Sequence, residues 1–221
     1  MSTRETEVIA QLAQPVSRRP TGTGVARTTP AGQHDPRLGP REEAQLVCDE
    51  MALRARRKIE VIIDRLSRDG YQFHANDDDQ TQAVPFIPAT AGAAEHASWL
   101  REQFDAVPMT LLSWVRLVGD VWLVGTHLDW PESSSADPLV IQVEGSHYPD
   151  SSMRGYFTDQ LDGWSEWNDG HPGTRFVLPL APDRYHKENV SGGEPYGMAL
   201  PDGCVDGLFV AKSRPCRSCP T

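Results

Sequence analysis

The sequence predicts an α+β fold in which N-terminal helices pack on one mixed or antiparallel sheet. Three segments between residues 40 and 119 repeat apolar residues at helical spacing, whereas the chain from residue 121 onward carries short apolar runs typical of buried strands. Helices followed by strands favour α+β over an alternating α/β arrangement. The 221 residues allow one domain of roughly 150–200 residues with tails.

The first helix is expected to begin near Pro40 and to end at Gly70. Proline in the first turn, followed by Glu42 and Glu43, suits a helix N-terminus, and glycine suits the left-handed position after the last turn. We expect the arginines of this helix to form a solvated face. The apolar residues that share the other face are Ile59, Ile62, Ile63 and Leu66.

Two further helices and four strands follow along the chain. Residues 92–104 keep Ala93, Ala97, Leu100 and Phe104 on one stripe, and the segment after Pro108 repeats apolar residues up to Gly119. We predict strands at residues 121–125, 138–143, 176–181 and 197–201. Proline at position 179 confines its strand to an edge or a bulge.

Composition divides the chain into a leader, a domain and a tail. Residues 1–40 are rich in Pro, Gly, Thr and Arg and predict a disordered leader, residues 41–210 predict a single domain, and residues 211–221 predict a loose tail. Lys and Arg outnumber Asp and Glu by 10 to 7 in residues 1–58, a net charge of +3. The remainder has 11 against 24, a net of −13, and the two sum to the −10 of the whole chain.

The net charge, the apolar stretches and the cysteine spacing argue against several classes of function. A general nucleic-acid binder needs a cationic surface, so we expect no nucleic-acid partner. No apolar stretch is long enough to span a membrane, and the N-terminus lacks the apolar region of a secretory signal. The four cysteines do not show the spacing of a disulfide scaffold. We therefore expect a cytoplasmic protein with reduced thiols.

Candidate nucleophiles and metal ligands lack the surroundings that their chemistry needs. Ser146 and Ser191 miss the second glycine of a GxSxG elbow, and Cys204 has no nearby histidine. Cys216 and Cys219 have the spacing of half a zinc site without a second pair, so a frayed tail is the better interpretation. The sequence therefore predicts no catalytic set, no metal and no cofactor.

Histidines leave one enzymatic alternative open. His127, His147, His171 and His186 show neither the HxH nor the HExxH spacing of a zinc site. His127, Asp129 and His186 could still converge in one pocket, which would indicate a metal-dependent or hydrolytic enzyme.

Acidic residues and two tryptophans supply the candidate contacts with a protein partner. Aromatic side chains concentrate the binding energy of interfaces, and acids steer a basic partner toward its site. Core packing and solubility are the competing explanations. The candidate contacts are Asp120, Asp129, Asp137, Glu144, Asp162, Trp164, Glu166, Trp167 and Asp169.

The order of segments resembles bacterial members of the SUKH superfamily, which includes a fungal cell-wall-synthesis regulator and many bacterial immunity proteins. The resemblance covers about residues 50–207, and the helix–Pro–helix–Val-Gly–strand–Asp-Pro-Leu order is its most specific part. It is carried by residues 56–73, 85–88, 107–119, 121–130, 137–140, 176–187 and 191–197. Two segments depart from the family pattern: the leader of about 40 residues, and residues 211–216, where the family continues into another helix.

The resemblance implies an α+β fold, no catalysis and binding to a protein partner. In bacteria the implied role is to neutralise a toxin by covering its active surface. A toxin that acts on nucleic acid must be basic where it holds phosphate, which fits the net charge of −13 over residues 59–221. We therefore predict an immunity-like domain whose partner is a basic toxin domain. A degraded family member without a present function is a third possibility, since the resemblance would place a further helix where residues 211–216 stand.

Overall fold

The computed structural model describes residues 39–145, 152–169, 175–190 and 192–210. These residues belong to one compact unit. The expected leader up to residue 38, the expected tail 211–221, His147, His171, Ser146 and Ser191 lie outside the described residues. The elements are α2 (Pro40–Asp69), β1 (Gln72–Phe73), β2 (Phe86–Pro88), α3 (Ala93–Phe104), α4 (Met109–Leu117), β3 (Gly119–Trp122), β4 (Gly125–Thr126), a 3-10 turn (Pro131–Ser135), β5 (Val140–Ile141), α5 (Met153–Asn168), β6 (Phe176–Ala181), α6 (Arg184–Lys187), β7 (Tyr196–Leu200) and β8 (Phe209–Val210).

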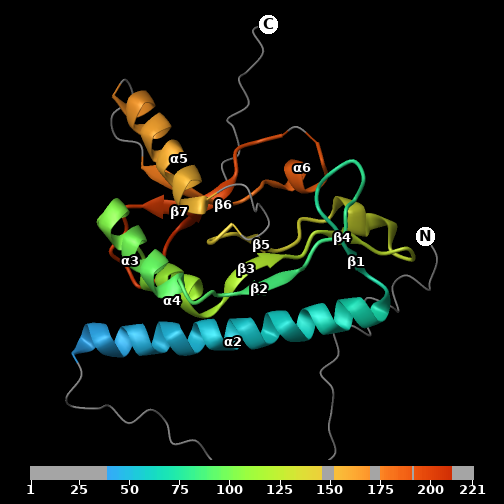
Figure 1. The fold of residues 1–221 in the computed structure, drawn as a ribbon, viewed down its shortest axis with the longest axis horizontal. Helices are drawn as coiled ribbons and strands as arrows, with labels where there is room; N and C mark the ends of the chain where they lie inside the picture. The colour runs from blue at the N-terminus through green and yellow to red at the C-terminus, as the bar shows by residue number, and fades with distance from the viewer. Residues whose placement is uncertain (1–38, 146–151, 170–174, 191, 211–221) are drawn as a thin grey trace, which may run out of the picture. The chain divides into compact units, whose positions relative to one another are not determined.

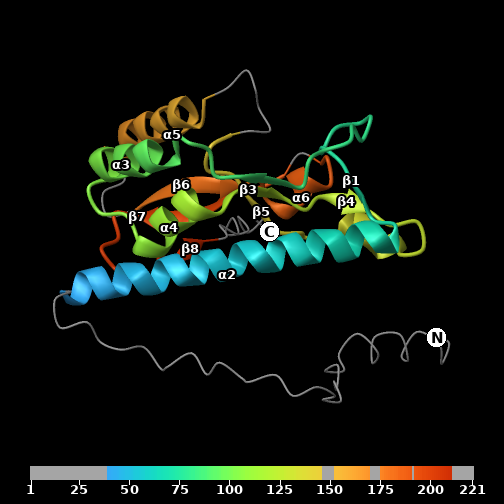
Figure 2. The same ribbon diagram turned by 60° about the horizontal axis from the view of Figure 1, so that its bottom comes forward.

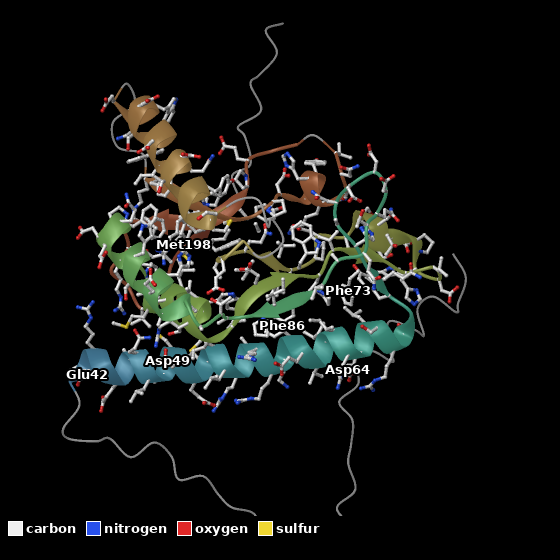
Figure 3. All side chains as sticks on the ribbon, viewed as in Figure 1. Glu42, Asp49, Asp64, Phe73, Phe86 and Met198 are labelled. Atoms are coloured by element: carbon white, nitrogen blue, oxygen red, sulfur yellow. The ribbon has the colours of Figure 1, made fainter. Side chains whose placement is uncertain are left out.

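Helix α2 runs along one side of the domain beneath β2, β3 and α4 (Figure 1). Its N-terminus is closed by the Glu42 carboxylate, which accepts a hydrogen bond of 2.8 Å from the Gly39 N–H. Gly70 ends it in the left-handed conformation with φ 98°, as predicted. Figure 3 labels Glu42 in its first turn and Asp64 somewhat more than one turn before its C-terminal end.

The buried stripe of α2 differs from the predicted one at a single position. Cys48, Ala52 and Ile59 are buried, and Ile63 is half-buried, but Ile62 is 43% exposed. The stripe thus advances by three or four residues from Cys48 to Leu66 and leaves Ile62 on the solvent side. Exposed arginines on the other faces pair with acids four residues away, as Arg54 does with Glu50 at 2.7 Å.

The strands form three small antiparallel sheets, ordered β1-β4, β2-β3-β5 and β6-β7-β8. The fold is therefore α+β, but the prediction of one sheet is wrong. One hydrogen bond of 2.7 Å, from the Gln142 N–H to the Leu180 carbonyl, connects the segment after β5 to β6. The predicted strand 121–125 is divided between β3 and β4, and within the predicted strand 138–143 only Val140 and Ile141 form a strand.

Strands β6 and β7 match the predicted ones closely. The register between them shifts at Pro179, where proline has no N–H to donate to the ladder. Gly119, at the start of β3, has φ 101° and a Cβ position 2.3 Å from the Ile87 carbonyl oxygen. Only glycine fits there, so β2 can lie directly against β3.

The main core lies between α3, α4, α5 and the sheet of β6 and β7. Leu112, Val115, Phe157, Leu178 and Leu200 are each at most 2% exposed and belong to one packed cluster. Helix α5 lies on the side of the sheets opposite to α2 in both views (Figures 1 and 2). None of the helices in the described ranges is both long enough and apolar enough to cross a membrane.

Candidate functional site

Helix α5 contains four of the nine predicted contact residues, and its C-terminal cap, Asp169, is a fifth. Its buried side carries Met153 and Phe157 in the core, with Leu161 and Trp164 packed against it. These residues are spaced at i, i+4, i+8 and i+11, which is the period of an amphipathic helix. Sequence interpretation noticed the acids and tryptophans of this segment and missed the helix, although that spacing predicts one.

The solvent side of α5 is acidic. Asp159, Asp162 and Glu166, at i, i+3 and i+7, are exposed on one face, and Asp169 follows as the C-terminal cap. Among the ion pairs of the described residues, none involves these four acids, whereas the acids of α2 pair with arginines. Asp159 belongs to this face although it was absent from the prediction. These four exposed acids define the acidic face of α5.

The negative charges of the acidic face oppose the helix dipole of α5. Negative charge is favourable at a helix N-terminus and unfavourable at the C-terminus. The first turn of α5 has no acid, the last turn has no base, and Glu166 and Asp169 stand at the C-terminal end. The arrangement weakens the helix, so helix stability does not explain these acids. Features that break a local rule without a structural gain concentrate at functional sites.

The two predicted tryptophans have different environments. Trp167 is 50% exposed beside the acidic face. Trp164 packs against the core cluster, with its ring 5.8 Å from that of Phe176. Trp164 thus holds α5 on β6, and its indole Nε1 is buried without a hydrogen-bond partner among the described residues. Of the two tryptophans, Trp167 is the more exposed.

Asp120 is not a partner contact, contrary to the prediction, because it is 1% exposed. One of its carboxylate oxygens accepts hydrogen bonds from the N–H groups of Val143 (2.7 Å) and Glu144 (2.9 Å). The charge therefore fixes the chain after β5 against β3. A buried carboxylate needs such donors to offset the loss of hydration.

Glu144 is half-buried and is held by Thr90, just before α3. Its carboxylate accepts hydrogen bonds from the Thr90 N–H at 3.2 Å and the Thr90 hydroxyl at 3.3 Å. Burial raises the pKa of Glu144, and the nearby Asp120 carboxylate adds to the increase, against the Thr90 hydrogen bonds. Its hydrogen bonds connect the chain after β5 to the segment before α3, so Glu144 supports the packing of α3.

A buried histidine of α3, His96, connects the chain after β5 to α5. His96 accepts a hydrogen bond from Arg154 on its Nδ1 at 3.2 Å, so its Nε2 donates to the Val143 carbonyl at 2.7 Å. Burial lowers the pKa of His96. Both ring nitrogens are occupied in the neutral form, so this histidine is a packing residue.

Asp137 is the partner of a buried lysine. Lys187 on α6 has a side chain only 4% exposed, and its Nζ donates to Asp137 at 2.5 Å and to the Pro138 carbonyl at 2.8 Å. The Tyr196 hydroxyl donates to the second oxygen of Asp137 at 2.9 Å. A carboxylate engaged in this way stabilises α6 and β7. Its side chain is still 38% exposed, so Asp137 as a partner contact stays a prediction.

The residues of the enzymatic alternative are not brought together by any contact of the described residues. His127 Nδ1 accepts from the Asp129 N–H at 3.1 Å, and its Nε2 donates to the Asp69 carbonyl at 2.6 Å. His186 instead bonds Asp183, the N-terminal cap of α6. Burial opposes ionisation of Asp183, but hydrogen bonds from His186 and the Gly193 N–H outweigh it and lower its pKa. Asp129 itself is exposed on the loop after β4.

No group of three or more metal-ligating side chains is present among the described residues. Comparison of the chain with protein-family models, with curated proteins and with solved structures found no match. The SUKH resemblance therefore stays a prediction. The site that the geometry distinguishes is the acidic face of α5 with Trp167.

Proposed function

We propose that this protein is a non-enzymatic, acidic interaction domain of the immunity type, which binds a basic toxin domain and neutralises it. The observation that supports this proposal most is the acidic face of α5: four exposed acids outside any ion pair of the described residues, beside a half-exposed tryptophan. Within the proposal, the chain is a SUKH-like protein of the cytoplasm, where the free thiols of Cys48 and Cys204 stay reduced.

The charge pattern suits a basic protein surface. Asp159 and Asp169 are separated by ten residues of helix, about 15 Å at 1.5 Å per residue. An array of this length matches the scale of a patch of lysines and arginines. Such complementarity accelerates association and suppresses wrong partners more than it adds affinity. Trp167 supplies the aromatic surface that carries binding energy at interface centres.

The test compares two charge reversals of equal size. In one variant, Asp162, Glu166 and Asp169 become lysine. In the matched control, Glu50, Glu60 and Asp64 of α2 become lysine; their side chains are 48–53% exposed and α2 lies on the opposite side of the sheets (Figure 2). Both variants gain the same net charge, so a difference between them reports the location of the charges.

Tagged wild type and both variants are incubated at low salt with lysate of the source cells, and the captured proteins are identified. We expect one basic protein with wild type and with the α2 control. We expect its capture to fall at least tenfold with the α5 variant and with rising salt. Co-expression of the captured protein should arrest growth, and wild type but not the α5 variant should relieve the arrest. Equal capture by the three proteins would contradict the proposal.

A further inference from the structure

The loop after β4 presents two large apolar side chains to solvent. Leu128 is 88% exposed, the highest value among the large apolar side chains of the described residues, and Trp130 is 48% exposed. A single exposed leucine needs no explanation, but a leucine and a tryptophan two residues apart form the kind of apolar patch that marks an interaction site. This patch belongs to residues 128–132, which we call the 128–132 tip.

Hydrogen bonds fix the shape of the tip. The His127 carbonyl accepts from the Trp130 N–H at 3.2 Å, and the His127 Nδ1 accepts from the Asp129 N–H at 3.1 Å. The hydroxyl of buried Ser133 donates to the Trp130 carbonyl at 2.6 Å and accepts from the His127 N–H at 2.8 Å. The exposure of Leu128 and Trp130 is therefore built into the loop, and a partner that binds the tip removes little further conformational entropy from it.

The tip is acidic. Asp129 and Glu132 are exposed, and neither forms an ion pair with another described residue. No Lys or Arg occurs from residue 117 to residue 153, so the neighbouring chain adds no positive charge. Acidic side chains are repelled by the anionic lipids of a membrane surface. A protein pocket that combines apolar walls with cations would complement both the apolar and the acidic side chains of the tip.

A cavity with those properties lies at the start of α2. It has a volume of about 620 Å³, which is typical of ligand pockets. Its walls include the buried side chains of Val107 and Leu112 and the half-buried side chain of Met109. Arg41 and Arg101 also line it, and neither arginine has an ion-pair partner among the described residues.

Two acids line the same cavity. The Glu42 carboxylate is bound to the Gly39 N–H and offsets the partial positive charge at the N-terminal end of α2. Asp105, the residue that ends α3, leaves one negative charge against the guanidinium groups of Arg41 and Arg101. The cavity is therefore positive overall, opposite in sign to the tip.

The tip and the cavity belong to opposite ends of α2. The His127 Nε2 donates to the Asp69 carbonyl at 2.6 Å and attaches the tip to the last residue of the helix, whereas Pro40 and Arg41 of the first turn line the cavity. Figure 1 shows α3 and α4 at the start of α2 and β4 at its end. The 30 residues of α2 span about 45 Å at 1.5 Å per residue, so the tip of one molecule reaches only the cavity of another.

We infer that the 128–132 tip of one copy of the chain docks into the cavity at the start of α2 of a second copy. Leu128 and Trp130 pack on the apolar walls, and Asp129 and Glu132 lie against the two arginines. Because the two contact surfaces differ, the first contact leaves one tip and one cavity free, and assembly continues head to tail unless a ring closes. No residue of the acidic face of α5 lines the cavity, so the inference does not depend on the proposed function.

Sedimentation velocity of the full chain tests the assembly over a hundredfold range of protein concentration, at low and at high salt. We expect the mean mass of wild type to exceed that of a dimer at high concentration and to fall as salt rises. Leu128→Ala with Trp130→Ala should weaken self-association at least tenfold. The control, Val84→Ala with Val190→Ala, truncates side chains that are 60% and 50% exposed outside both surfaces, and should associate as wild type does. A wild type that stays monomeric throughout, or equal association of the two variants, would overturn the inference.

Exchange of the charges tests whether the tip and the cavity meet each other. A tip variant carries Asp129→Arg and Glu132→Arg, and a cavity variant carries Arg41→Glu and Arg101→Glu. Each variant alone brings like charges together at the contact and should stay monomeric, with the circular dichroism of wild type. An equimolar mixture should associate at least tenfold more tightly than either variant alone, because each surface then meets one of opposite charge. Two folded variants that do not associate on mixing would contradict the pairing.

Lipid vesicles test the alternative partner of an exposed leucine and tryptophan. Wild type is sedimented with vesicles of phosphatidylcholine, with and without phosphatidylserine, and we expect no binding to either. If wild type binds vesicles without self-association, and Leu128→Ala with Trp130→Ala abolishes that binding, the tip is a membrane contact and the inference is overturned. Such a failure leaves the proposed function standing, because capture of the basic partner depends on the acidic face of α5.

Discussion

Replacing Asp120 by alanine should destabilise the domain strongly, because this carboxylate connects β3 to the chain after β5. Truncation leaves the N–H groups of Val143 and Glu144 without their acceptor. A buried donor without an acceptor costs about 1–3 kcal/mol. Since the Glu144 N–H lies closer to solvent, we expect a total loss of about 3 kcal/mol. For a domain of this size, the melting temperature should fall by roughly 6–12 °C.

Urea unfolding followed by tryptophan fluorescence measures this loss, since Trp122 of β3 is only 3% exposed. Asp120→Asn keeps an accepting oxygen for these two N–H groups and loses the charge assistance, so it should cost about half as much. Asp129→Ala is the control, because an exposed acid of this kind typically changes stability by less than about 0.5 kcal/mol. An Asp120→Ala protein within about 0.5 kcal/mol of wild type would refute the structural role assigned to this carboxylate.

Three further predictions concern stability. Burial lowers the pKa of His96 below its ordinary value of 6.5, so the unfolded chain binds that proton more readily and the free energy of unfolding declines as the pH falls below about 6.5. In urea titrations, His96→Gln should flatten this decline between about pH 7 and 5. An unchanged slope would contradict this prediction. Asp137→Ala should cost about 2 kcal/mol, below the 3–5 kcal/mol of a fully buried pair, since its side chain is 38% exposed; adding Lys187→Met should recover part of the loss, and no recovery would argue against the pairing. Glu166→Gln with Asp169→Asn should raise the free energy of unfolding by about 0.5–1 kcal/mol by removing negative charge from the end of α5; a decrease would show that these acids serve the fold.

The sequence predicted α3 and α4 correctly because local spacing decides them: Ala93, Ala97, Leu100 and Phe104 occupy one stripe whatever the helix packs on. The same argument was available for α5 at Met153, Phe157, Leu161 and Trp164. Two helix glycines and the run of acids concealed that period, because both are features typical of loops.

Long-range partners could not be predicted in this way. The burial of Asp120 depends on N–H groups 23 and 24 residues away, and an isolated aspartate in a sequence is by default exposed. The division into three sheets likewise depends on which strand edges meet. The nine predicted contacts therefore have different environments. Asp120 is buried, Asp137 binds Lys187, Glu144 supports α3, Trp164 packs against the core, and Asp129 is exposed on the loop after β4. The other four, Asp162, Glu166, Trp167 and Asp169, lie in the C-terminal half of α5 and at its cap.

The measurement that tests the central claim most directly is the salt dependence of partner binding by the two triple reversals. The acidic-face account predicts that the basic partner binds the α2 control as it binds wild type, and that binding weakens as salt rises. It predicts that reversal of Asp162, Glu166 and Asp169 removes most of the affinity and most of its salt dependence. If the two variants lose affinity equally, only the net charge of the protein matters, and the assignment of α5 as the binding surface is wrong.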